Sequence, residues 1–202
     1  GASNTFVGQN SGGATTEGAQ NTAVGEGALA TNTTAGNNTA IGRDAMYANL
    51  TGSSNTAVGH SAGKALTTGV QNDIFGNLAG DALTDADYNV ALGYATLSTD
   101  TLGSRSTAVG HSALAVQNFT TATDSHNTAV GFYAGVAVTV GKFNTLVGSL
   151  NGDAITTGEN NSSLGCDALS ANVHGDNVVA IGNEAAQLLN PTASSGNDTH
   201  MN

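Results

Sequence analysis

Two histidines in this sequence stand in the same tetrapeptide, and their surroundings are the first place to look for catalysis. His60 and His111 each lie in "GHSA", and the first continues as "GHSAG", the G-x-S-x-G spacing of a nucleophile elbow. Such a site also needs an acid that orients the imidazole and a shaped pocket. One repeat before His60 the same segment reads "GRDAM", so histidine and serine are interchangeable there. We therefore expect no catalytic residue and a protein that is not an enzyme.

Metal-ligating residue types are also present, but without a ligand pattern. Asp81, Asp85 and Asp87 could offer carboxylate oxygens to Ca²⁺, yet they lack the Gly-Gly-x-Gly-x-Asp regularity of calcium-binding β-rolls. Cys166 is the single cysteine, so the chain has no intrachain disulfide and no thiolate cluster. We expect no metal and no cofactor.

Aromatic and imidazole rings form a more suggestive group in the second half of the chain. Aromatic rings beside polar groups can bind sugars, because the apolar C–H face of a sugar packs on a ring. The alternative is that the rings only pack a bulging loop. The residues that we predict to contact a glycan or another cell-surface receptor are Tyr94, His111, Phe119, His126, Phe132 and Tyr133.

A repeated pentapeptide indicates which elements position these side chains. "NTFVG" begins at residue 4 and near-copies follow at 21, 38, 55, 72, 89, 106, 127, 144, 161 and 178. The steps are equal except for one longer step, which places a four-residue insertion within 117–126. A fixed period over nearly the whole chain is typical of a stacked array. The period is too short for a two-helix repeat but sufficient for one coil of a β-solenoid.

The sequence therefore predicts an all-β fold, a parallel β-solenoid or β-roll of eleven 17-residue coils. We expect this domain to span 1–189, followed by an irregular tail over 190–202. Positions in each coil are numbered from the first residue of the pentapeptide, usually Asn. Gly ends the pentapeptide at position 5 and recurs near position 15, where we expect positive φ at both corners. Stacked Asn amides at position 1 are expected to bond along a ladder.

Position 4 carries a large apolar residue in every copy, and we expect this column to form the inner core. Its members are Val7, Val24, Ile41, Val58, Phe75, Leu92, Val109, Val130, Val147, Leu164 and Ile181. Positions 9 and 12 alternate: where one is large, the other is small or polar, as in Leu29 with Asn32 and Gly63 with Leu66. Only Gly12 with Thr15 departs from this rule. One core slot per coil, filled from either corner, explains the alternation, because double filling would overpack it.

Strand side chains alternate in direction, so an inward position 4 predicts an outward position 3, which is mostly Ala. A flat apolar stripe of this kind favours self-association, most simply as a homotrimer. Thr recurs at position 2, and a regular Thr array on a flat face could bind ice. An inward position 4 would however turn these Thr side chains inward as well.

Charge excludes several classes of partner. The net charge is −11, with only four Lys and Arg residues, so we expect no nucleic acid, whose phosphates would be repelled. No apolar run approaches the roughly 20 residues of a membrane-spanning helix, so we expect no membrane insertion.

The motif "NTAVGxxA" resembles the head repeats of trimeric autotransporter adhesins, with "NVVAIGNEA" at 177–185 as the closest copy. It also resembles repeats of phage tail fibres. The resemblance covers residues 4–189 and implies a trimeric β-roll in an attachment fibre, although the adhesin repeat is typically shorter than the one in this chain. We expect a structural, receptor-binding segment of a virion tail fibre that contacts the host cell surface. The alternatives are a bacterial surface adhesin head and an ice-binding solenoid.

Overall fold

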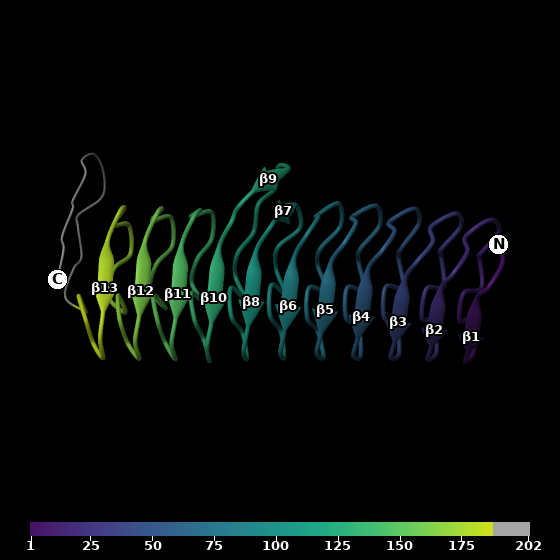
Figure 1. Cartoon of the computed structure of the whole chain (residues 1–202), viewed down its shortest axis with the longest axis horizontal. Helices are drawn as coiled ribbons and strands as arrows, with labels where there is room; N and C mark the ends of the chain where they lie inside the picture. The colour runs from purple at the N-terminus through teal and green to yellow at the C-terminus, as the bar shows by residue number, and fades with distance from the viewer. Residues whose placement is uncertain (188–202) are drawn as a thin grey trace.

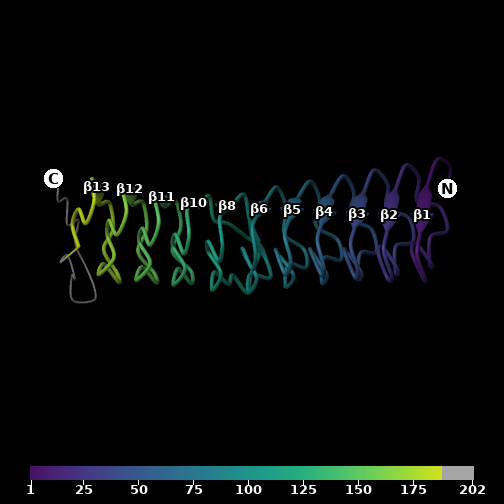
Figure 2. The same cartoon turned by 90° about the horizontal axis from the view of Figure 1, so that it is seen from below.

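The computed structural model describes residues 1–187, and it is an all-β parallel β-solenoid (Figure 1). Figure 2 shows the strands of the long sheet along one side of the rod, with the turns opposite. These strands are β1 Thr5–Val7, β2 Thr22–Val24, β3 Thr39–Ile41, β4 Thr56–Val58, β5 Asp73–Phe75, β6 Val90–Leu92, β8 Thr107–Val109, β10 Thr128–Val130, β11 Thr145–Val147, β12 Ser162–Leu164 and β13 Val179–Ile181. About ten complete coils lie between them. The predicted tail over 190–202 lies outside the described residues.

The register confirms that equivalent residues stack directly. Thr22 pairs with Thr39 and Val24 with Ile41, so each residue lies beside its equivalent one repeat later. Every other pair of neighbouring strands keeps that shift except β8 and β10, where Thr107 pairs with Thr128 across the longer step. The extra residues form a bulge in which β9 (Thr123–Asp124) pairs with β7 (Gly103–Ser104), visible above the rod in Figure 1. The insertion therefore extends one coil without disturbing the long sheet.

The predicted core ladder at position 4 is wrong, because the strands present the opposite face to the interior. Position 3 points inward: Ala23, Ala40 and Ile74 are fully buried, as are most of their equivalents. The position 4 side chains are exposed or half-buried along the whole rod. The exposed fraction is highest at the two ends, 56% for Val7 and 64% for Ile181. Those that turn out to lie on the surface are Val7, Val24, Ile41, Val58, Phe75, Leu92, Val109, Val130, Val147, Leu164 and Ile181. Because the coil is narrow, the turns opposite the strand leave room mainly for Ala at position 3.

The alternation of positions 9 and 12 is confirmed, because each such pair places one large side chain in the core. The large residue of the position 9 and 12 pair is fully buried in each described coil that has one: Leu29, Met46, Leu66, Leu83, Leu97, Leu114, Val138, Ile155 and Leu169. The apparent exception in the first coil is explained by Phe6, which points inward from position 3. A Cβ added to Gly12 would lie only 2.5 Å from the Phe6 ring, so the ring occupies the space beside this glycine. In the first coil, position 3 therefore supplies the large side chain that positions 9 and 12 lack.

An Asn ladder runs inside the rod at position 1. The side-chain oxygen of Asn21 accepts the backbone N–H of Asn38 at 3.0 Å, and the amide of Asn38 donates to the carbonyl of Gly52 at 2.8 Å. The same two bonds recur in most coils. The ladder therefore satisfies buried backbone groups at the corner where each coil turns into its strand.

The two recurrent glycines serve different purposes. Gly at position 5 has φ between 125° and 147° from Gly8 to Gly182, which favours Gly. Gly at position 15 is not in the left-handed region, contrary to expectation. There the constraint is space: a Cβ on Gly52 would lie 2.3 Å from the carbonyl oxygen of Gly69 in the next coil.

Candidate receptor-contact surface

Four of the six predicted contact residues form one cluster where the chain leaves the strands. Tyr94, His111 and Phe132 occupy position 6 in successive coils. The ring centroids of Tyr94 and His111 are 4.9 Å apart, and those of His111 and Phe132 are 5.5 Å apart. Tyr133 joins them with its ring edge-on to Phe132, at 4.3 Å. Stacking of the coils therefore brings these rings together, as the spacing predicts.

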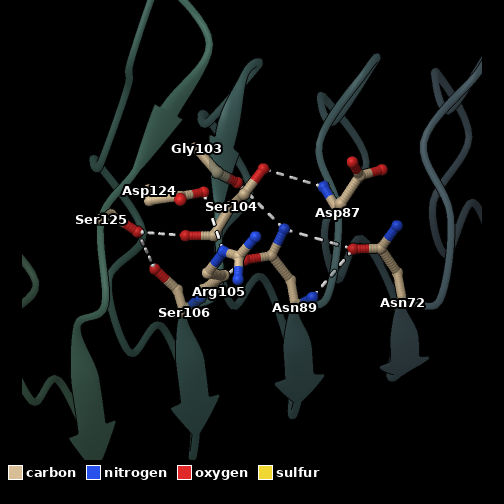
Figure 3. A network of polar contacts seen from close by, with 9 residues as sticks. All are labelled: Asn72, Asp87, Asn89, Gly103, Ser104, Arg105, Ser106, Asp124 and Ser125. Carbon is tan, nitrogen blue, oxygen red and sulfur yellow. Dashed lines mark hydrogen bonds and ion pairs between the residues drawn. The ribbon is translucent and has the colours of Figure 1, made fainter.

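His126 belongs to a second column, at position 17, where the chain enters the strands. Its ring stacks on Phe143 with centroids 5.4 Å apart and 12° between the planes. Earlier in the same column, the guanidinium carbon of Arg105 lies 5.1 Å from the ring centre of Tyr88. Arg105 also forms an ion pair with Asp124 on β9, at 2.9 Å. The insertion therefore supplies the carboxylate that holds Arg105 over Tyr88, and Figure 3 shows Asp124 beside Arg105.

Phe119 is not available to a receptor, because it is only 5% exposed. It packs over Gly103, where an added Cβ would lie 2.8 Å from the Phe119 ring. Its backbone N–H donates to buried Asp100 at 3.0 Å. The ring therefore packs the insertion, which is the alternative that the sequence left open for these aromatics.

Polar side chains fill the gap where Ser106 replaces the ladder Asn. The hydroxyls of Ser106 and Ser125 lie 2.6 Å apart, and Ser125 donates to the carbonyl of Ser104 at 2.8 Å (Figure 3). Gln117 donates to Ser106 at 3.1 Å and accepts from the Asn127 amide at 2.8 Å. Residues of the insertion thereby replace the side chain that the ladder lacks.

The stacking changes how a sugar could bind this surface. The ring of His111 has Tyr94 on one side and Phe132 on the other, so both of its faces are covered. A sugar packs on a ring face, so the covered faces of His111 are closed to it. Sequence reasoning found the columns but not this consequence.

The exposed position 4 column is a candidate functional surface that sequence reasoning placed inside. Together with position 2 it forms one face of the long sheet, and Thr22 and Thr56 are half-buried on it. The large size of the position 4 side chains wrongly suggested that they point inward. The small residues at position 3 were the sequence feature that could have identified the inward side of the strand.

Two of the three acids considered as calcium ligands accept hydrogen bonds from a neighbouring coil. Asp85 accepts the Thr68 hydroxyl at 2.5 Å, and Asp87 accepts the N–H of Val70 at 2.7 Å. Burial raises the pKa of the third, Asp81. Within residues 1–187, no three His, Cys, Asp or Glu side chains gather as metal ligands do.

Comparison with known proteins found no family model, no curated protein and no solved structure that matches the chain. Among the described residues, no helix is long and apolar enough to cross a membrane. Function must therefore be argued from the surface itself.

Proposed function

We propose that this chain is a stiff, non-catalytic segment of an attachment fibre, assembled as a homotrimer. A virion tail fibre that contacts a glycan or protein on the host cell is the first choice, and a bacterial surface adhesin head is the alternative. The observation that carries the proposal is the apolar column at position 4, which is exposed or half-buried and continues over all the strands of the long sheet.

The composition of this face supports burial against another molecule. Among all the residues at positions 2 and 4, only Asp73 is charged, although the chain has a net charge of −11. Eleven strands about 4.8 Å apart make the face about 50 Å long, and two columns make it about 12 Å wide. The area is on the order of 600 Å² per copy, and two such faces reach about 1,200 Å², the lower end for specific interfaces.

The periodicity of the face favours a second copy of this chain as the partner. A column with one apolar side chain every 4.8 Å or so can be matched throughout only by a surface with the same rise. A parallel copy has that rise by construction. Association along the position 4 column leaves the corners, with their variable residues, free for a receptor. Position 2 then lies at the edge of the contact next to the position 17 corner, where Asp73 stays accessible.

Light scattering on the purified chain tests the proposal. A homotrimer has about three times the 19.8 kDa mass of one chain. A particle of one chain mass at micromolar concentration would rule out the trimeric fibre.

Ice binding is a second candidate, because the Thr column shares the outer face. Thr22, Thr39 and Thr56 stack in register beside the position 4 column, so the objection that they point inward no longer applies. Asp73 and Val90 interrupt the row. Thermal hysteresis in a solution of monomers would favour this candidate, whereas freezing without hysteresis would exclude it.

A further inference from the structure

A shallow hollow of about 400 Å³ lies on the N-terminal side of the Arg105–Tyr88 pair. It is lined by Ser54, Gln71, Asp73 and Tyr88. Three of these residues occupy position 17 in successive coils, and Asp73 occupies position 2 on β5. None of them belongs to the six residues predicted from the sequence.

Tyr88 supplies aromatic surface to the hollow. Arg105 covers one face of its ring, and the column continues on the other side with Gln71, which lines the hollow. The side chain is 46% exposed. The ion pair between Arg105 and Asp124 holds the guanidinium over the ring, and Tyr88 itself lines the hollow.

The polar groups around the ring have the chemistry that a hydroxyl-rich ligand needs. The Asp73 carboxylate accepts hydrogen bonds, the Gln71 amide both donates and accepts, and the Ser54 hydroxyl does both. Aromatic surface with a few convergent polar groups is typical of small-molecule sites. Asp73 and the net charge of −11 disfavour acidic sugars.

The repeat itself departs from its pattern at this place. Position 2 is Thr in four successive coils before it becomes Asp73, and position 17 is small or polar from Ser3 to Gln71 before it becomes Tyr88. Neither change is needed for packing, since both side chains are exposed.

We infer that this hollow binds a neutral hexose or N-acetylhexosamine unit, with its C–H face on Tyr88 and its hydroxyls on Asp73 and Gln71. The inference rests on the attachment role proposed above, for which it names the ligand class. A single shallow contact of this kind binds in the millimolar range.

Saturation-transfer NMR with the methyl glycosides of glucose, galactose, mannose and N-acetylglucosamine tests it on the full chain. We expect transfer to the protons of one sugar face for at least one glycoside. Asp73→Thr and Tyr88→Asn should each weaken binding about tenfold, because they remove a charged acceptor and the ring. Both replacements occur at the same positions in other coils, so folding is retained.

Tyr47→Ala is the control, because Tyr47 is exposed and lies outside both ring columns. Ala30 and Ala115 occupy the same position in other coils, so folding is retained and binding should be unchanged. Absence of transfer for all four glycosides overturns the inference, and so does undiminished binding by the Asp73 and Tyr88 variants. Light scattering on the same samples separates it from the fibre proposal. A trimer without sugar binding refutes only this site, and a monomer that binds sugar refutes only the fibre.

Discussion

Single residues hold this coil in backbone conformations that L-amino acids rarely adopt. Positions 7, 9 and 17 are left-handed throughout the described coils, as at Asp44 with φ 57°, Met46 with φ 46° and Asn37 with φ 61°. These three residues show that the left-handed conformation at these positions accepts a side chain. Position 5 differs, since its φ near 130° and the next coil together exclude a Cβ.

Gly59→Ala should therefore be strongly destabilising. Its Cβ would lie 2.4 Å from the carbonyl oxygen of Gly76, at a φ of 142°. We expect a loss of at least about 2 kcal/mol, which lowers the melting temperature by roughly 4–8 °C in calorimetry. Gly27→Asn is the control, because position 7 holds Asn10 in the first coil. Equal melting of the two variants would contradict the steric account.

Asp153 should make stability depend on pH. Burial raises its pKa in the folded state, and repulsion from Asp167 adds to the effect, so the fold favours the protonated acid. This contribution is fully present below the ordinary pKa of about 3.9 and is lost as pH rises through the folded value. Asp153→Asn should therefore raise the melting temperature at pH 7, by about 2 °C, and not at pH 3. An increase of the same size at both pH values would point to a cause other than ionisation.

At the scale of the coil, packing requires one large side chain from positions 9 and 12, and either position can supply it. Asn32 at position 12 donates to the carbonyl of Ala35 at 3.2 Å when Leu29 fills the slot. Leu66 fills it from position 12 when position 9 is Gly63. The residue that is suitable at position 12 therefore depends on the residue at position 9 of the same coil.

Exchanging the two corners of one coil tests this coupling. Leu29→Gly alone leaves a cavity and should lower the free energy of unfolding by about 2–5 kcal/mol. Asn32→Leu alone adds a second large side chain to the same space and should lower it by about 1–3 kcal/mol. The double variant should recover a large part of the summed loss, since one large side chain again fills the space. Thermal melts of the four proteins measure the coupling, and simple additivity would disprove a shared slot.

The repeat made the coil length, the stacking register and the slot predictable, because each leaves a periodic trace in the residues. The side of the strand that faces inward was not predictable from residue size. In a coil this narrow, Ala23 fits inside and Val24 is left outside, the reverse of the usual trend. The columns of rings were predictable as well. The burial of Phe119 was not, because the path of an insertion is not fixed by the repeat around it.

For the whole molecule, the exposed column makes a prediction that is separate from folding. Val58→Lys together with Val109→Lys should convert the proposed trimer to monomers, because charges buried between copies would lack partners. The melting temperature of the single chain should change little, since both side chains point outward. Sedimentation velocity measures the mass. His60→Lys, in a column that already holds Arg43, is the control and should leave the assembly intact. A trimer that survives the double substitution would move the interface elsewhere.

The elongated coil between β8 and β10 shows what this architecture tolerates. The inserted residues leave the pairing of Thr107 with Thr128 in step, and the bulge satisfies its own polar groups. A rod of this kind can acquire new loops at one corner while its axis stays straight. Natural variation and peptide grafting can both use that freedom, provided that the inserted segment brings partners for the amides it displaces.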